Sequence, residues 1–401
     1  MHIPLRTRRP PRSFRTASAA LMAAALVLAC DKGGGELPVH KGKPHAQRDA
    51  TPASSDFENG GAPSKPKETI SPAALIDRAR PLIQALPPQA DNPANPLTDA
   101  KIELGRMLYF DPRLSKGQGL SCNTCHVLTH YGIDTREQSG ARSKTSEGHR
   151  KQFGERNTPT VYNAAFALAQ FWDGRAADVE QQAGMPIVNP VEMAMANPEG
   201  VVAVIKSIPG YAPLFQAAFP DASDPLTYEN IGKAIGAFER KLVTPAAFDK
   251  FMKGDTSALD EDQMRGLKLF LDVGCTQCHT GPAIGGTQFQ KLGSVKPWPN
   301  LVDTGREKHT GAAADRYFFK VPTLRNVAET GPWLHDGSIG TLEKMVELMS
   351  EHQTSRGKLS AEETRLLVAF LGALTGELPR EYIAEPKLPE NGPTTPAPDP
   401  S

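Results

Sequence analysis

The sequence predicts an all-α protein with few or no strands, and three observations support this prediction. In segments such as Ile231–Phe238, apolar residues recur at three- and four-residue spacing, the period of a helix. Long segments with alternating apolar and polar residues, which would indicate strands, do not occur. The pattern Gly-x-x-Leu-aromatic-apolar-Asp occurs at Gly105–Asp111 and at Gly266–Asp272, and it predicts two domains related by a weak internal repeat. Helix start signals precede both copies, at Thr98 and at Asp260.

The first residues have the features of a secretory signal peptide, which we place at residues 1–29. Residues 1–17 contain five arginines and no acidic residue, and the apolar run that follows is too short to span a bilayer. The run ends in Val27–Cys30, which resembles a bacterial lipobox, whose cysteine becomes the lipidated N-terminus after cleavage. We therefore expect a periplasmic protein attached to a membrane only through a lipid anchor on Cys30. Ordinary cleavage, with Cys30 as a stray thiol, is the alternative.

Two segments with few large apolar residues flank the part that is expected to fold. Residues 30–68 are rich in Gly, Pro, Lys and Ser and predict a disordered tether, and the proline-rich residues 386–401 predict a disordered tail. The length between them, about 315 residues, suits two domains, which we place at 69–240 and 241–385. Loss of the five signal-peptide arginines reduces the 45 basic residues to 40, against 45 acidic ones. This balance argues against nucleic acid as a partner.

Two Cys-x-x-Cys-His runs, Cys122–His126 and Cys275–His279, contain four of the five cysteines. Such a run is typical of c-type haem attachment, in which both thiols bind the haem and the histidine ligates the iron. A zinc site would have its Cys pairs about 15–20 residues apart, whereas 149 residues separate Cys125 from Cys275. A thioredoxin-like site would need a βαβ pattern, which the flanking sequence lacks. We therefore expect two cytochrome c-like domains with two covalent haems, held by Cys122, Cys125, Cys275 and Cys278 and ligated by His126 and His279.

The second axial ligand of each iron decides what the haem does, because a filled site carries electrons and an open site binds substrate. Downstream of the second run, the candidates are His309, His335, Met345, Met349 and His352. Met345 and Met349 are four residues apart and share one helix face, and the residues alone leave this choice open. Near the first run, His149 lies in a polar, glycine-containing segment. It could cap the iron and leave on activation, or it could be a solvated loop histidine.

Five further segments are distinctive: Arg156–Val161, Phe171–Arg175, Pro186–Met193, Pro322–Val327 and His335–Gly337. Together with the two Cys-x-x-Cys-His runs, they resemble the bacterial di-haem cytochrome c peroxidases. The resemblance extends from about Leu97 to Gly376, most of the part that is expected to fold. It implies a peroxidatic haem of low potential in the N-terminal domain, an electron-transfer haem of high potential in the C-terminal domain, and calcium between them.

The resemblance also implies roles for individual residues at the peroxidatic haem. There, His126 is the permanent ligand and His149 the removable sixth ligand. Glu192 is the catalytic acid/base, and Gln182 lines the same pocket. One carboxyl can take the proton from iron-bound peroxide and return it to the leaving oxygen, which contributes about 10²–10⁴-fold in rate.

At the electron-transfer haem, the resemblance implies that His279 and Met349 are the two ligands. Trp172 is implied as the electron bridge between the haems. Calcium is implied at Asn157 and the carbonyls of Thr330 and Pro332, a set of oxygen ligands that calcium prefers.

The expected reaction is the reduction of H₂O₂ to two waters, with electrons from a small cytochrome c or cupredoxin, and the resemblance allows a homodimer. Two alternatives stay open. One is a non-catalytic di-haem electron carrier with both irons permanently six-coordinate. The other is the related di-haem enzyme that oxidises tryptophans in a partner protein. That type has a tyrosine in place of the methionine ligand and lacks the removable histidine, so Met349 and His149 argue against it.

Overall fold

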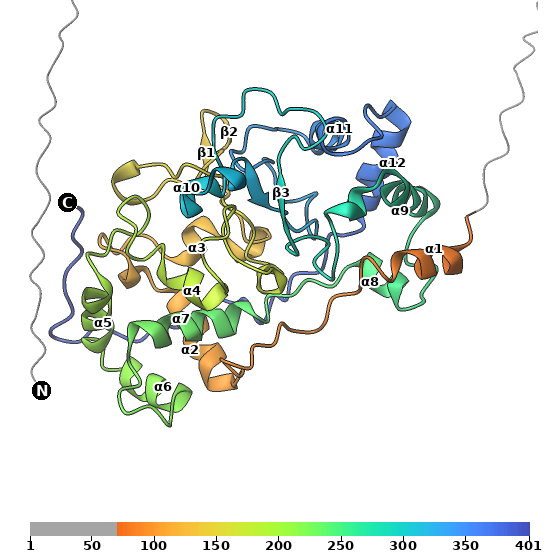
Figure 1. The fold of residues 1–401 in the computed structure, drawn as a ribbon. Coiled ribbons are helices and arrows are strands. Elements are labelled where there is room, and N and C mark those ends of the chain that lie inside the picture. The colour runs from red at the N-terminus through yellow and green to blue at the C-terminus, as the bar shows by residue number, and fades with distance from the viewer. Residues whose placement is uncertain (1–69) are drawn as a thin grey trace, which may run out of the picture. The chain divides into compact units, whose positions relative to one another are not determined.

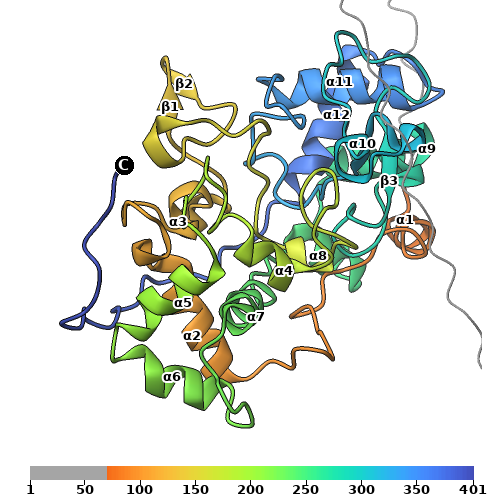
Figure 2. The same cartoon turned by 60° about the vertical axis from the view of Figure 1, so that its left-hand side comes forward.

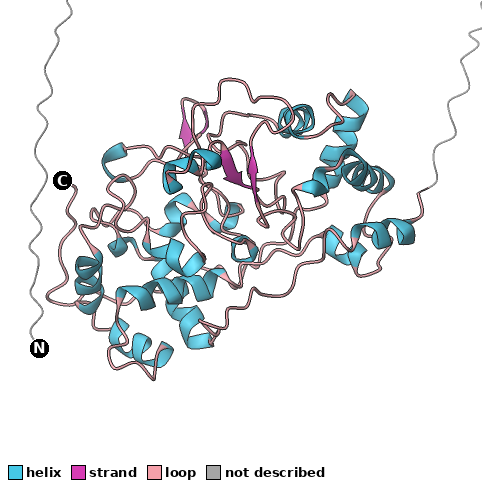
Figure 3. Cartoon of the chain, in the orientation of Figure 1, coloured by secondary structure: helices cyan, strands magenta, loops and turns pink. Residues whose placement is uncertain are grey.

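The computed structural model describes residues 70–401. The predicted signal peptide (1–29), the lipidation site Cys30 and the tether (30–68) lie outside the described residues. Within the described part, the chain is mostly helical, with two small antiparallel sheets of two strands each (Figures 1 and 3). The predicted all-α class is therefore confirmed.

The helices are α1 (Pro72–Ala79), α2 (Asp99–Phe110), α3 (Cys122–Cys125), α4 (Val179–Gly184), α5 (Pro198–Lys206), α6 (Tyr211–Ala218), α7 (Tyr228–Glu239), α8 (Ala247–Met252), α9 (Glu261–Val273), α10 (Glu307–Thr310), α11 (Leu342–Gln353) and α12 (Ala361–Gly372). Strand β1 (Glu137–Gln138) pairs with β2 (Ala141–Arg142), and β3 (Phe289–Lys291) pairs with β4 (Phe318–Lys320). No single helix within residues 70–401 has the length and apolar character to cross a bilayer. The pair α5 and α6 meets that test only when taken together across a 113° bend.

The helices that precede the two Cys-x-x-Cys-His runs begin where the sequence predicts. The side chain of Thr98 accepts a hydrogen bond from the backbone of Lys101 (3.2 Å) at the start of α2. At the start of α9, Asp260 and Gln263 each accept a hydrogen bond from the other's backbone N–H (2.8 and 3.0 Å), which forms a capping box. These caps fix the first turns of α2 and α9.

Two large hydrophobic cores lie side by side in residues 70–401, and a small third cluster contains Leu292, Phe319 and Leu334. The first is built from α2 and α4 to α7 and includes Leu108, Phe215 and Phe238. The second is built around α1, α8, α9 and α12 and includes Phe270 and Phe370. Figures 1 and 2 agree in showing α1 beside α9, at the opposite end from α2, α5 and α6. The first helix of the described residues, α1, thus packs into the second core. The predicted domain limits stay a prediction.

In both cores a glycine lets two helices approach backbone to backbone. A Cβ on Gly105 of α2 would lie 1.9 Å from the carbonyl oxygen of Ala234 in α7. A Cβ on Gly266 of α9 would lie 2.0 Å from the carbonyl oxygen of Leu366 in α12. A glycine inside a helix costs about 0.5–1 kcal/mol relative to alanine, so close packing explains its presence at both positions.

Residues 386–401, predicted to be a disordered tail, contain no helix or strand but make specific contacts. Arg113 donates to the Pro389 carbonyl (2.8 Å), Gln118 donates to the Pro396 carbonyl (2.9 Å), and the backbone N–H of Asp399 donates to the Lys116 carbonyl (3.0 Å). Proline prevents regular structure here, but it leaves backbone carbonyls free to accept hydrogen bonds. We call residues 386–401 the strap; it is the dark blue segment that ends at the C-terminus in Figure 2.

Candidate haem-binding sites

The second Cys-x-x-Cys-His run opens directly onto a cavity of about 250 Å³. Gly274 ends α9 with φ +89°, a conformation that favours glycine, and turns the chain into Cys275. Cys275, Cys278 and His279 all line the cavity, whose other walls are mainly apolar. Two thiols and an imidazole at the edge of an apolar cavity are the groups that a covalent haem requires.

His279 is held in a form that can ligate iron. Its Nδ1 lies 3.3 Å from the Ile284 carbonyl oxygen, and burial lowers the pKa of the imidazole to about 4. The ring is therefore neutral at pH 7. With Nδ1 as the donor to this carbonyl, Nε2 carries the free lone pair.

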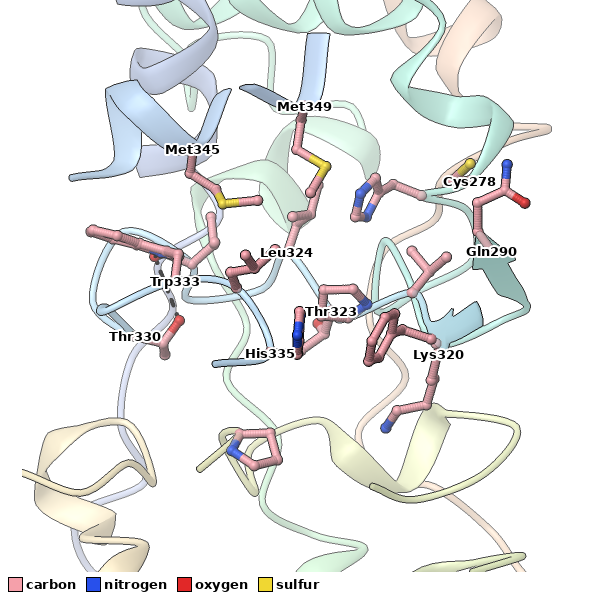
Figure 4. Close-up of a pocket in the computed structure, with 18 of the residues that line it drawn as sticks. Cys278, Gln290, Lys320, Thr323, Leu324, Thr330, Trp333, His335, Met345 and Met349 are labelled. Carbon is pink, nitrogen blue, oxygen red and sulfur yellow. Dashed lines mark hydrogen bonds between the residues drawn. The ribbon is translucent and has the colours of Figure 1, made fainter. Parts of the chain in front are cut away.

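The wall provided by α11 carries both candidate methionines. Figure 4 shows the side chains of Met345 and Met349 reaching into the cavity, and His335 also lines it. His309 and His352 do not line it, and the Nδ1 of His352 lies 3.0 Å from the Lys296 carbonyl. The geometry narrows the sixth-ligand candidates, while the choice of Met349 over Met345 stays a prediction.

Two polar groups in this cavity suit the carboxylates of a haem. The Nδ1 atom of buried His335 has no hydrogen-bond partner among residues 70–401. Lys320 of β4 also lines the cavity, and burial lowers its pKa to about 8 (Figure 4). The apolar walls suit the haem macrocycle, and the Lys320 ammonium and the His335 Nδ1 atom could pair with its carboxylates. Lys320 was missed by the sequence reasoning, although a lone lysine in the apolar run Phe318–Val321 could have indicated it.

The first Cys-x-x-Cys-His run has the same local arrangement. Cys122 and Cys125 bound the short helix α3, and the Nδ1 of His126 lies 3.2 Å from the Gly132 carbonyl. Burial lowers the pKa of His126, and the Tyr109 hydroxyl donates to its backbone carbonyl (2.8 Å). The imidazole is again neutral and oriented. His130, four residues later, is exposed and bonded to Thr129, which argues against it as a ligand.

Two loops meet beside this first run, and they carry His149, the predicted removable ligand, and Glu192, the predicted acid/base. The backbone N–H of His149 donates to the Glu192 carbonyl (2.8 Å), and a Cβ on Gly148 would lie 2.1 Å from the Val191 carbonyl oxygen. Burial raises the pKa of Glu192, while Arg175 and a hydrogen bond from Asn189 oppose that rise. A carboxyl with a raised pKa is closer to the point at which it can both accept and return a proton.

The structure places Glu192 close to the first Cys-x-x-Cys-His run, but it gives no such contact for Gln182. Burial is the main cause that raises the pKa of Cys125, and the charge of Glu192 adds to it, so the two side chains are close. Gln182 lies half-buried in α4, where its backbone carbonyl accepts from Met185 (3.0 Å). Its place in the peroxidatic pocket stays a prediction.

Trp172 lines the cavity at the second Cys-x-x-Cys-His run and is hydrogen-bonded to the backbone of Asn157. Its indole N–H donates to the Asn157 carbonyl (2.9 Å), and its ring lies edge-on to His335, with centroids 6.4 Å apart. The neighbouring Asp173 forms an ion pair with Arg156 (2.7 Å), which also binds Asp303 (2.7 Å). This half-buried network, which the sequence reasoning missed, holds the Trp172 loop in place.

The three residues expected to bind calcium come together although they are distant in sequence. Asn157, Thr330 and Pro332 line the same small cavity, next to Asp134. Within residues 70–401, no group of three or more His, Cys, Asp and Glu side chains has the spacing of a metal site. The set brought together here consists of amide and carbonyl groups instead, which suits calcium rather than zinc or iron.

Comparison with known proteins decides the family. Residues 99–257 match the family model of the di-haem cytochrome c peroxidases. The cytochrome c551 peroxidase of Nitrosomonas europaea is 46% identical over 300 residues, which cover 74% of this chain and 86% of that protein. The chain belongs to the di-haem cytochrome c peroxidase family. The cytochrome c551 peroxidase of Pseudomonas aeruginosa is 42% identical over 331 residues, covering 81% of this chain and 92% of that protein.

Membership of this family supports two c-type haems and an oxidoreductase that acts on peroxide. The relatives of the di-haem peroxidase also include the methylamine utilization protein MauG of Methylorubrum extorquens, 37% identical over 74% of this chain and 83% of that protein. Among solved structures, a MauG-like protein associated with microbial copper homeostasis has a TM-score of 0.64 at 28% identity, covering 75% of this chain and 97% of that one.

Proposed function

We propose that this peroxidase reduces H₂O₂ to two waters beside the first Cys-x-x-Cys-His run, with Glu192 as the acid/base and His149 as a ligand that leaves on activation. The observation that carries the proposal is the contact between the two loops. The backbone N–H of His149 donates to the Glu192 carbonyl at 2.8 Å, next to Cys122–His126. A removable ligand and a proton-transfer group on touching loops can respond to each other. When bound, the two haems would supply the two electrons that the reaction needs, one from each iron, and two protons complete the two waters.

Glu192 would take a proton from one oxygen of the peroxide and return it to the other oxygen as the O–O bond breaks. The raised pKa supports this role, because burial shifts the carboxyl towards the pH at which both its forms are populated. The charge of Arg175 opposes this rise in the pKa of Glu192. Gln182 would line the same pocket.

The backbone beside His149 supports a loop that rearranges. Arg150 and Lys151 have φ values of +55° and +59°, which non-glycine residues rarely adopt. Each such residue costs on the order of 1–3 kcal/mol. If the loop moves to a position that relieves this backbone strain, the relief offsets part of the free energy lost with the old contacts. The ligated and released positions of His149 can therefore be close in free energy.

The second site would hold the electron-transfer haem, with His279 and Met349 as ligands and Trp172 as the bridge to the first. The α11 helix keeps its two thioethers in the cavity, which suits a permanently filled iron. No tyrosine is among the described residues that line this cavity, which argues against the partner-oxidising type of di-haem enzyme. Calcium at Asn157, Thr330 and Pro332 would fix the carbonyl that accepts from Trp172.

We further propose that electrons arrive from a small cytochrome c or cupredoxin in the periplasm. The predicted signal peptide and Cys30 support export and a lipid anchor, and covalent haem attachment takes place outside the bacterial cytoplasm. The relatives named cytochrome c551 peroxidases support a small cytochrome as donor. A homodimer stays a prediction.

The variant Glu192→Gln tests the catalytic assignment. We expect peroxide turnover to fall by about 10²–10⁴-fold, while covalent haem content is unchanged. Turnover is followed by oxidation of a reduced small cytochrome c, and haem content by the absorbance of its pyridine complex. The control is Glu199→Gln, an exposed carboxylate at the start of α5, which should have wild-type turnover. Wild-type turnover in Glu192→Gln would refute the acid/base role, and no peroxide turnover in the wild type would indicate an electron carrier.

A further inference from the structure

The strap, residues 386–401, ends on the histidine that is proposed to leave the first iron. We propose that the strap holds His149 in its released position by accepting a hydrogen bond from the His149 ring, and so favours the open peroxidatic site. This inference rests on the proposed role of His149 as a removable ligand.

The strap begins at a buried charged anchor. Arg113 is 8% exposed and is held by Asp111 through its Nε and Nη2 atoms. Its remaining nitrogen, Nη1, donates to the Pro389 carbonyl (2.8 Å) and to the side-chain oxygen of Asn391 (2.7 Å). Hydrogen bonds from a buried guanidinium are among the strong ones, and leaving such a donor unpaired is costly. The first part of the strap therefore completes the surroundings of Arg113.

A second anchor fixes the middle of the strap at the end of α5. Thr395 donates through its hydroxyl to the Ser207 carbonyl (3.1 Å), and the two hydroxyls lie 3.1 Å apart. A Cβ on Gly392 would lie 2.3 Å from the same carbonyl oxygen. Only glycine allows this close approach, so the strap is fitted to the surface that it covers.

The last residues of the strap join the loop that carries Glu192. The backbone of Lys116 donates to the Met193 carbonyl (2.9 Å) and accepts from the Asp399 N–H (3.0 Å). Its ammonium group donates to the backbone oxygen of Ser401 (2.7 Å) and lies 3.4 Å from Asp399. Lys116 thus links the strap to the residue next to Glu192.

The same backbone oxygen of Ser401 meets the ring of His149. Nε2 of His149 lies 3.0 Å from this oxygen and, because the oxygen can only accept, Nε2 is the donor. A ring nitrogen that bears a proton for donation has no lone pair for a metal. Donation to the strap and ligation of iron by this nitrogen therefore exclude each other. Removal of one such hydrogen bond should shift the balance between the two positions by about two- to tenfold.

The test uses the holoprotein with its chain ending at Pro398. This variant loses the contacts of Asp399 and Ser401 but keeps the anchors at Arg113 and Ser207, so its fold is preserved. In the oxidised protein, we expect the ratio of six-coordinate low-spin to high-spin first haem to rise about two- to tenfold. Absorption and electron paramagnetic resonance spectra measure that ratio. An unchanged ratio overturns the proposal.

Two point variants and a combination make the test specific. Lys116→Gln removes the ammonium contact with Ser401 and should shift the ratio in the same direction by less, whereas a shift in the opposite direction would contradict the proposal. Lys387→Ala, at an exposed position of the strap, should have no effect. In a His149→Ala background, the shorter chain should leave the first haem as high-spin as in the full-length variant.

The same variants separate the two levels of the argument. If His149→Ala opens the first haem but the shorter chain does not differ from the full chain, the strap has no such role and the proposed function stands. If His149→Ala leaves the first haem unchanged, His149 is not its ligand, and the role of the strap is refuted with it.

Discussion

The two haem sites share one means of attachment and differ in what faces it. At both, a Cys-x-x-Cys-His run follows a capped helix, and the Nδ1 of the histidine faces a backbone carbonyl five or six residues later. The second site is closed by helix α11, with Met345 and Met349 on one face. The first is bordered by two loops, around His149 and Glu192, and by the strap. Loops open at lower free energy than packed helices, so this difference supports the proposed roles of the two haems.

The helix pairs behind the two sites also match, with one exception. Gly105 lies against the carbonyl of Ala234 and the Cβ of Phe238, and Gly266 lies against the carbonyl of Leu366 and the Cβ of Phe370. Both pairs of contacts are four residues apart in α7 and α12. The next residue is Glu239 in α7 but Leu371 in α12. The first half therefore buries a carboxyl where the second half has an apolar side chain that lines its cavity.

Of the changes that test this comparison of the two sites, the largest expected effect comes from removing Met349, the proposed ligand at the second site. We expect Met349→Leu to lower peroxide turnover by at least about tenfold, since even residues behind a metal ligand contribute 10- to 100-fold. The loss follows because methionine ligation raises the potential of the donating haem. The matched control is Met345→Leu on the same face of α11, which should stay near wild type. Redox titration and turnover measure both variants, and a reversed order would identify Met345 as the ligand.

The second prediction concerns Glu239, the buried carboxyl that distinguishes the two helix pairs. Burial raises its pKa to about 8. Between the ordinary pKa of a glutamate and this value, the unfolded chain releases a proton that the folded chain retains. Stability therefore falls as the pH rises through this range, by on the order of 3 kcal/mol at pH 7. Glu239→Gln should remove that loss.

Equilibrium unfolding in urea at pH 5 and at pH 8 measures this effect. The wild type should be less stable at pH 8 than at pH 5, and Glu239→Gln should show a much smaller difference. Glu229→Gln, an exposed carboxyl on the same helix, serves as the control and should keep the wild-type dependence. An identical pH dependence in Glu239→Gln would show that this carboxyl is ionised in the folded protein.

Local chemistry was predictable from the sequence, and tertiary packing was not. The two Cys-x-x-Cys-His runs and the caps at Thr98 and Asp260 each depend on residues a few positions apart. The burial of Glu239 depends instead on which side of α7 meets Glu180, which no local pattern in α7 reveals. Lys320 enters the cavity only because β4 pairs with β3.

The strap is a second case in which tertiary contacts were not predictable from the local sequence. Its proline-rich composition predicted disorder, because such a segment buries little apolar surface. Its partners, Arg113, Lys116 and Ser207, lie almost 200 residues or more away in the sequence, and they offer polar groups rather than an apolar face. Composition alone cannot indicate such an acceptor surface.

The smallest expected effects concern the glycines that bring both helix pairs together. Gly105→Ala and Gly266→Ala should each lower the free energy of unfolding by about 1–3 kcal/mol, because the added methyl group meets a backbone carbonyl. The sign is informative, since alanine normally stabilises a helix relative to glycine by about 0.4–1 kcal/mol. Gly372→Ala in α12, where a Cβ would meet nothing within 4 Å, should show that normal gain. Urea midpoints followed by circular dichroism give the comparison. Similar losses at 105 and 266 would support equivalent packing in the two halves, and a gain at either position would show that the helices there can separate without cost.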